Sequence, residues 1–300
     1  MKKINQSYEP QDKPWTQKRG KLWRINPARL VPRRGTEHPV CIIALFEFRE
    51  NIRNKWLFVY ALSFLFLSAL ITYMGTSDPL QASGSLLNLM LLLVPLFSLM
   101  FGSISFSESL PFSEILVAQP ISRRQIFLGK WLGLGSGLSL SFLLGMGLGS
   151  LMQLNLSQKG FGSYFFLLLL GVLLTFVFLS MSFHMVNVAR RRELIFGIVL
   201  LNWFFFFVLY DLMVMGVALL LGDYPLEIPM LILVFLNPID LARVLLLMQI
   251  DLSALMGYSG ALFQKYLGHG MGMTLGSAAL LIWVFVPAWL GLRSFQRKDL

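Results

Sequence analysis

Charge is scarce in this chain, and cysteine is almost absent. Only 13% of its 300 residues are Asp, Glu, Lys or Arg, about half of the quarter that is usual in soluble domains. We therefore predict an integral membrane protein with one transmembrane domain rather than two globular ones. Because Cys41 is the single cysteine, the chain can form no intramolecular disulfide and no cysteine-based metal site.

Motifs for nucleotide binding and hydrolytic chemistry are also missing. No GxxxxGK[ST] phosphate loop occurs, because Lys130 follows Gly129 but precedes Trp131 and the upstream glycine is absent. Neither an HExxH zinc motif nor a GxSxG nucleophile turn is present. We expect that the chain is not an enzyme and needs no cofactor.

One short stretch, HGMGM, has residue types that suit copper(I). Its imidazole and thioether groups belong to His269, Met271 and Met273. The chain has 15 methionines, so coincidence explains this stretch better, and we predict no metal site.

Apolar residues, in contrast, make up 56% of the chain and form long runs. A helix that crosses a bilayer needs about 20 mostly apolar residues. Six segments meet this requirement and predict six transmembrane helices: 56–73, 86–106, 131–151, 163–186, 194–221 and 272–292.

Positive charge is distributed unequally between the connections of these spans. The formal net charge is +10. Alternate connections, counted together with the termini, hold 22 Lys and Arg on one side and 3 on the other. Since these residues are retained in the cytoplasm, both termini are predicted to be cytoplasmic. Charges that flank spans determine topology, so we expect no nucleic acid as a partner.

The first 38 residues are polar and basic and contain four prolines. They lack the apolar core of a signal peptide, and we predict a disordered cytoplasmic tail over residues 1–38, followed by a six-helix transmembrane domain over 39–300.

A short helix is predicted between this tail and the first span. Apolar residues recur at helical spacing on one face, and charged residues lie elsewhere, which is typical of an amphipathic helix in the membrane interface. A soluble helix packed on a partner is the alternative. The apolar face consists of Cys41, Leu45, Phe48, Ile52 and Trp56, and the polar residues are Glu47, Arg49, Glu50, Arg53 and Asn54. As interfacial contacts we single out Phe46, Glu47, Arg49 and Arg53.

The connection 222–271, between the last two spans, is long and faces outward in this topology. Asn237 is a helix cap in the pattern NPID, Pro238 suits the first helical position, and Asp240 stands where a reciprocal cap would. Asp240 and Arg243 are three residues apart and can pair along one face. We predict an ordered helical structure that could be re-entrant.

Polar residues inside the spans are few. We interpret His184 as an interfacial histidine, Asn202 as a hydrogen-bonding partner of a neighbouring helix, and Asp211 as a structural residue near the outer interface. The GxxxG pairs Gly133/Gly137 and Gly145/Gly149 would let neighbouring helices approach closely.

The stretch EILVAQPISRRQIFLGKWLG resembles the cytoplasmic loop of ABC-2 type permeases. That family has roughly Leu-Leu-x-x-Pro-[Val/Ile]-Ser-Arg, then Leu-Gly-Lys, which falls here on 120–123 and 128–130. The resemblance covers about 40–300. Pro111 departs from it, standing where many relatives have glycine.

Two outer stretches, LNPIDLARVLLL and LMGYSGALFQKYLG, resemble the permeases that serve maturation of nitrous oxide reductase. The matching residues are Asn237, Pro238, Asp240, Arg243, Met256, Gly257, Tyr258 and Gly260. The polar tail is longer than this group leads us to expect.

The resemblance implies an all-α permease with the fold of type V exporters, in the bacterial inner membrane. Two copies would form the membrane core and bind two cytoplasmic ATPases, in which the ATPase activity would reside. A β-helical periplasmic protein would sit on the outer face. The expected ATPase-coupling residues are Glu108, Phe112, Glu114, Ile115, Leu116, Gln119, Pro120, Ser122, Arg123 and Arg124. The expected periplasmic contacts are Asn237, Pro238, Asp240, Arg243 and Tyr258.

Local physics agrees with this picture at the loop. Residues 112–118 can form a short helix that stops before Pro120, and Ser122 can cap the next helix. Two alternatives stay open: an ABC-2 permease for another substrate, such as a drug, a lipid or an ion, and an ATP-independent carrier or membrane enzyme.

Overall fold

The computed structural model describes residues 39–74, 79–117, 121–151, 158–189, 192–220, 227–250 and 257–297. These residues are almost entirely helical, and no strand occurs among them. The tail predicted for residues 1–38 lies outside them. The elements are α1 (Pro39–Ile52), α2 (Lys55–Met74), α3 (Pro79–Val117), α4 (Arg123–Leu151), α5 (Gln158–Val188), α6 (Arg192–Phe204), the π-helical turn η2 (Phe205–Leu209), α7 (Tyr210–Leu220), α8 (Glu227–Leu236), α9 (Pro238–Ile250) and α10 (Gly257–Arg297).

Six helical segments are long and apolar enough to cross a membrane, which confirms the all-α prediction with six spans. Helices satisfy their own backbone hydrogen bonds, as the interior of a bilayer requires. The spans are Lys55–Met74, Ser83–Ser109, Arg123–Gly149, Gly162–Val188, Leu194–Leu220 and Gly270–Arg297. A seventh is possible if α8 and α9, which are bent by 108° relative to one another, count as one broken span.

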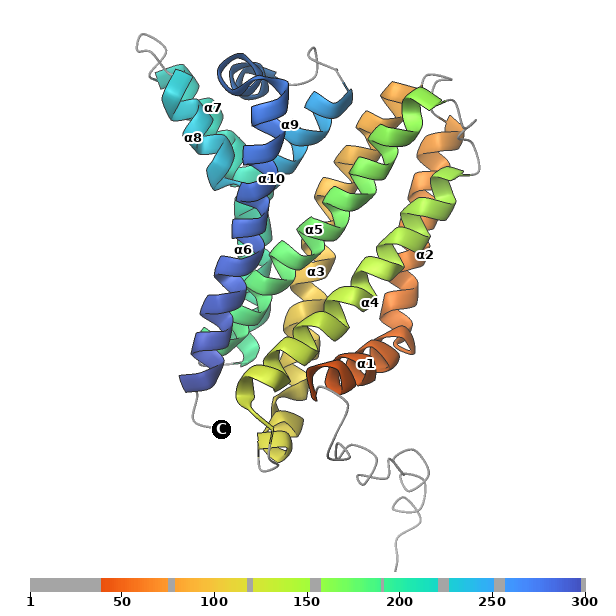
Figure 1. The fold of residues 1–300 in the computed structure, drawn as a ribbon, viewed down its shortest axis with the longest axis vertical. Helices are drawn as coiled ribbons and strands as arrows, with labels where there is room; N and C mark the ends of the chain where they lie inside the picture. Colours follow the sequence, from red (N-terminus) through yellow and green to blue (C-terminus); the bar gives the residue numbers. More distant parts are fainter. Residues whose placement is uncertain are drawn as a thin grey trace, which may run out of the picture. The chain divides into compact units, whose positions relative to one another are not determined.

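Three of the spans form the centre of the bundle. In an 18-residue apolar window of each span, between 56% and 67% of the positions are buried in α3, α4 and α5, against 22% in α2 and 6% in the span built from α6, η2 and α7. Helices α1 and α2 pack on α4, α10 packs on α5, and α6 packs on α3. Figure 1 shows α1 lying across one end of the spans, with α7, α8 and α9 near the opposite end.

Glycines on α4 let α1 and α2 approach it closely. A Cβ atom at Gly133 would stand 2.6 Å from the carbonyl oxygen of Ala44 on α1, and one at Gly145 would stand 2.8 Å from Cβ of Phe64 on α2. Gly137 is less constrained, since its nearest neighbours would be 3.5 Å away. A Cβ atom at Gly149 would stand 2.8 Å from the carbonyl oxygen of Leu65 on α2. The predicted close-approach role therefore applies at Gly133, Gly145 and Gly149, because contacts this short leave no room for a side chain.

The last helix is two helices joined at one glycine. Gly268 has φ of 64° and ψ of 175° within α10. This positive φ favours glycine, because a Cβ atom would clash with the backbone. It turns the chain from a short helix into the sixth span.

Candidate functional site

Two regions with specific polar contacts lie at opposite ends of the bundle. The first, here named the basic end, comprises α1, the start of α4 and the ends of α3, α5 and α10. The second comprises α8 and α9 with the part of α7 that contacts them, and it is here named the outer hairpin after the side on which the predicted topology places it.

The loop that leads into α4 ends in a reciprocal cap. The Gln125 backbone N–H donates to Ser122 Oγ at 3.3 Å, and the Ser122 backbone N–H donates to Gln125 Oε1 at 3.0 Å. This confirms Ser122 as the cap. The partner Gln125 was not predicted, although the spacing Ser-x-x-Gln is the signature of a capping box.

The prediction of a separate loop helix over residues 112–118 is wrong. Helix α3 continues without interruption from Pro79 through Pro111 to Val117, because a helix of two turns gains stability as an extension of a longer one. The backbone of Phe112, Glu114, Ile115 and Leu116 thus belongs to α3. Their side chains, and all of Gln119 and Pro120, lie outside the part of the chain that the structure describes. Glu108 and Arg124 are exposed.

A cluster of four fully buried phenylalanines holds the helix ends together around this loop. Phe106, Phe127, Phe183 and Phe295 come from α3, α4, α5 and α10. Their ring centroids lie 4.3 Å to 6.0 Å apart in five pairs, the range of favourable aromatic contacts. Arg123 Nη1 also donates to the backbone oxygen of Gln296 at 3.1 Å. These contacts join the ends of four helices next to the start of α4.

Helix α1 is attached to α4 by a buried ion pair. Lys130 Nζ lies 2.8 Å from Glu47 Oε1, and their side chains are only 3% and 9% exposed. The sequence placed Glu47 on the polar side of an interfacial helix, whereas the structure turns it toward the bundle together with Ile43 and Asn51. Asn51 Nδ2 also donates to the Glu47 backbone oxygen at 2.8 Å.

The predicted apolar face of α1 points away from the bundle. Leu45 and Ile52 are 50% and 48% exposed, and Cys41 is exposed. Arg49 and Arg53 are also exposed, and Phe46 is half-buried. An outward apolar face fits a helix in the membrane interface.

Burial and the nearby Glu47 charge raise the pKa of the Glu50 carboxyl, and Lys130 partly opposes this. The basic end thus holds two carboxylates near one ammonium group. Loss of that ammonium group would leave like charges facing one another.

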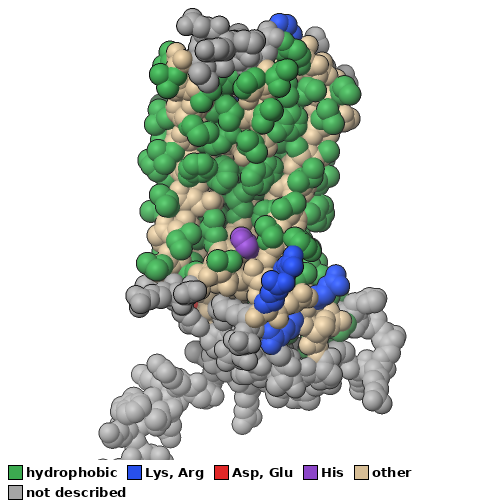
Figure 2. Space-filling model, turned by 90° about the vertical axis from the view of Figure 1, so that its left-hand side faces the viewer, with side chains coloured by type: hydrophobic (Ala, Val, Ile, Leu, Met, Phe, Trp, Pro, Cys, Tyr) green, Lys and Arg blue, Asp and Glu red, His purple; other side chains and the backbone are tan. Residues whose placement is uncertain are grey.

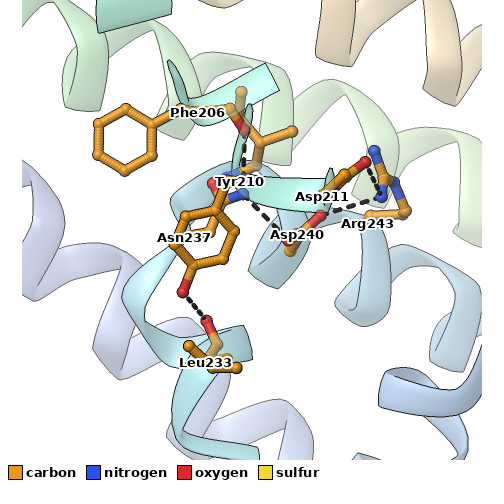
Figure 3. A network of polar contacts seen from close by, with 8 residues as sticks. Phe206, Tyr210, Asp211, Leu233, Asn237, Asp240 and Arg243 are labelled. Atoms are coloured by element: carbon orange, nitrogen blue, oxygen red, sulfur yellow. Dashed lines mark hydrogen bonds and ion pairs between the residues drawn. The ribbon is translucent and has the colours of Figure 1, made fainter. Parts of the chain in front are cut away.

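The outer hairpin is organised by Asn237, which has no exposed surface. Its Oδ1 accepts from the Ile239 N–H at 3.0 Å, which confirms the predicted cap of α9. Its Nδ2 donates to the Phe206 backbone oxygen and to Asp240 Oδ2, both at 3.0 Å. Asp240 thus contacts the side chain of Asn237 rather than the backbone N–H that a reciprocal cap would bind. Figure 3 shows Asn237 between the π-helical turn and α9.

Arg243 connects the hairpin to the fifth span. Its Nη1 lies 2.9 Å from Asp240 Oδ1 and 3.3 Å from Asp211 Oδ2 on α7. The predicted pairing of Asp240 with Arg243 is confirmed, and Asp211 gains a structural role that its position near the outer interface suggested. The Tyr210 hydroxyl donates to the Leu233 backbone oxygen at 2.7 Å (Figure 3). The hairpin and the outer half of the fifth span are thus joined by side chains from both.

The π-helical turn explains why the backbone carbonyl group of Phe206 accepts a hydrogen bond from a side chain outside its helix. A π-turn displaces the usual i to i−4 hydrogen bonds and is often found at functional positions. Asn237 supplies an N–H to one of its carbonyl groups, as Figure 3 shows. No sequence signal for this turn was recognised in the run of four phenylalanines at 204–207.

The residues predicted to contact a periplasmic partner differ in how exposed they are. Asn237 and Pro238 are buried, so in this structure they hold the chain together rather than face a partner. Asp240 is 14% exposed and Arg243 31%, so Arg243 is the more accessible of the two. The side chain of Tyr258 lies outside the described residues. Asn202 contacts the neighbouring helix α5, where its Nδ2 donates to Met181 Sδ at 3.8 Å.

Within the described residues, no group of three or more His, Cys, Asp or Glu side chains is placed to hold a metal ion. The polar contacts of the described residues instead join helices at each end of an apolar bundle. An arrangement of this kind defines a multi-span helical membrane protein.

Comparison with known proteins specifies the class. Residues 41–300 match the family described as ABC-2 family transporter protein, and the chain belongs to that family. It is 30% identical over 269 residues to a probable ABC transporter permease protein NosY of Pseudomonas aeruginosa, covering 84% of this chain and 94% of that protein. It is 28% identical over 270 residues to the protein of the same description from Stutzerimonas stutzeri, covering 83% of this chain and 93% of that protein.

Proposed function

We propose that this permease is the membrane subunit of a NosY-type transporter that serves copper-site maturation of nitrous oxide reductase in denitrification. It would couple cytoplasmic ATP hydrolysis to export, or to conformational work on a periplasmic partner. The observation that carries this proposal is the likeness to proteins named NosY over nearly their whole length. The expected setting is the bacterial inner membrane, with both termini in the cytoplasm.

The basic end supports a coupling role. The capped start of α4, the buried ion pair to α1 and the phenylalanine cluster make a stiff connection around the loop. A NosF-like ATPase dimer would bind there, through the segment from Glu108 to Arg124. Since packed cores respond to displacement as units rather than by continuous deformation, movement of the loop would be passed to α1, α5 and α10.

A second copy of the chain is the expected partner within the membrane. Only 6% of the positions in an 18-residue apolar window of the fifth span are buried, although the span carries the π-helical turn and Asp211, whose side chain is 43% exposed. Charged residues inside a membrane usually face protein or water rather than lipid. This favours a homodimer in which the outer part of the fifth span is covered.

On the outer face we propose a NosD-like β-helical protein resting on the outer hairpin. The burial of Asn237 and Pro238 assigns them a supporting role, so the contact would fall on Arg243, on Tyr258 and on exposed residues of α8 such as Ile232. The copper chemistry would belong to the partner proteins, since this chain is expected to hold neither cofactor nor metal.

Affinity purification of the full-length chain from its own membranes tests the assignment. The expected co-purifying proteins are an ATPase with a phosphate loop and a β-helical extracytoplasmic protein. Deleting the permease should leave nitrous oxide reductase exported but lacking active copper, and the intact permease should restore it.

The alternatives give different results in the same experiment. If an ATPase co-purifies with the chain but the reductase is fully active in the deletion strain, the protein would be an ABC-2 exporter of another substrate, such as a drug, a lipid or an ion. Absence of any ATPase from the purified complex would favour an ATP-independent carrier or a membrane enzyme.

A further inference from the structure

A group of arginines gathers at the basic end, away from α1. Arg123 and Arg124 are in the first turn of α4, and Arg293 and Arg297 are near the end of α10. The hydrogen bond from Arg123 to the Gln296 backbone oxygen brings these two helix ends together. Figure 2 shows Lys and Arg side chains gathered at one end of this face, below an apolar surface. We name these four residues the arginine patch.

The patch has an excess of positive charge. Arg124, Arg293 and Arg297 are exposed. Among the described residues, the ion pairs join Lys130 to Glu47 and Arg243 to the two aspartates, and none of them includes Arg124, Arg293 or Arg297. Guanidinium groups bind phosphate through several N–H donors at once. The charge of the patch therefore favours an anion with phosphate oxygens.

The patch is continuous with a strip of α10 that faces outward. Ile282, Phe285 and Trp289 recur at helical spacing and are 61%, 61% and 56% exposed. Trp289 ends this strip, and the Arg293 guanidinium carbon lies 5.4 Å from the centre of its ring. Tryptophan is enriched where the acyl chains of a bilayer meet the headgroups. Arg293 therefore stands at the level of lipid phosphates, one turn beyond the apolar strip.

We propose that the arginine patch binds the headgroup of an anionic glycerophospholipid, such as phosphatidylglycerol, whose acyl chains lie along α10. The apolar strip favours a lipid over a free anion or a soluble protein, because a lipid has acyl chains that can lie on the strip as well as a headgroup that can bind the arginines. A lipid held there bridges the start of α4 and the end of α10, the two elements that flank the proposed coupling loop. Basic clusters at the ends of spans recognise anionic headgroups in this way.

Native mass spectrometry of the full chain, released from nanodiscs of equal phosphatidylcholine and phosphatidylglycerol, measures which lipid is retained. We expect phosphatidylglycerol to be enriched on the wild type. In the triple variant Arg124→Gln, Arg293→Gln, Arg297→Gln the enrichment should fall about tenfold or more, since each basic residue near an anionic surface contributes about a fivefold preference.

A matched control removes the same charge at the same end. Arg49→Gln, Arg53→Gln, Lys55→Gln changes three exposed basic residues near α1 and should keep the wild-type enrichment. A triple Arg→Lys variant of the arginine patch should keep part of it. Millimolar inorganic phosphate should not displace the lipid, because phosphate has no acyl chains for the strip.

Three outcomes would overturn the proposal. Unchanged enrichment in the glutamine variant would remove the patch from lipid binding. An equal loss in the control would mean that total charge alone attracts the lipid. Displacement by inorganic phosphate, or loss of a bound ATPase with unchanged lipid enrichment, would assign the patch to a free anion or to a protein contact. None of these readouts depends on what the transporter does for the reductase.

Discussion

Replacing Lys130 by methionine removes the cation between α1 and α4 while nearly preserving side-chain length. The ammonium nitrogen lies 2.8 Å from Glu47, and both side chains are almost completely buried. After the substitution Glu47 stays in the same contact without a counter-charge, and Glu50 lies near enough to repel it. We expect α1 to detach from α4.

The size of the effect follows from this geometry. At 2.8 Å and an effective dielectric constant of about 20, the attraction between the two charges is about 6 kcal/mol. Desolvation of both groups offsets much of it, and removal of one partner of a buried pair costs about 3–5 kcal/mol. Glu47→Gln should cost less, because Lys130 keeps an oxygen acceptor and the nearby Glu50 carboxylate. The double variant Lys130→Met, Glu47→Leu should approach the wild type, because it leaves no charge unpaired.

The single cysteine provides the assay. Cys41 is exposed on α1, so a spin label there reports by electron paramagnetic resonance whether the helix is fixed. The label should become more mobile in Lys130→Met and regain wild-type mobility in the double variant. Equilibrium unfolding in mixed micelles should give the same order of stability. Lys55→Met, which removes an exposed lysine at the same end, should change neither quantity.

Two results would refute this reasoning. If Lys130→Met left the label immobile and the free energy of unfolding within about 0.5 kcal/mol of the wild type, as is usual for surface substitutions, the ion pair would not hold α1. If the double variant were as unstable as Lys130→Met, the loss would come from packing rather than from an unpaired charge.

Three further predictions follow from the same contacts. Asn237→Ala removes a helix cap and leaves the Phe206 carbonyl group without its donor, so the free energy of unfolding should fall by about 2–4 kcal/mol; a loss near zero in mixed micelles would contradict the role of Asn237 in joining the hairpin to the fifth span. Docking of α1 raises the pKa of Glu50, so the charged carboxylate destabilises the docked state. This destabilisation is complete at pH values above the folded-state pKa and absent at pH values below the unfolded-state pKa. Glu50→Gln should thus lower the mobility of a Cys41 label at pH 7 but not near pH 4, and an equal effect at both pH values would exclude a charge effect. Ile115→Asp and Leu116→Asp should reduce co-purification of the ATPase while the permease is still inserted, and undiminished ATPase binding in both variants would exclude this segment as the coupling contact.

The spans and the local caps could be predicted from the sequence. In a bilayer, a run of about 20 apolar residues can satisfy its backbone only as a helix, so the six spans follow from length and composition. Ser122 and Asn237 cap helices through contacts within three residues, and such contacts depend little on the rest of the chain. The continuous helix through Pro111 was missed because proline and the following loop suggested a boundary that the long span overrides.

The sequence by itself thus determined a six-span membrane protein, the residues that begin its helices and the resemblance to ABC-2 permeases. Only the tertiary structure decided which polar groups meet. Glu47 and Lys130 are 83 positions apart, and Asp211 and Arg243 are 32 apart, so no local pattern connects them. Helical periodicity also shows that α1 has two faces but not which one meets protein. In a membrane the apolar face can turn to lipid, and the buried charge of Glu47 is tolerated because Lys130 on another helix lies opposite.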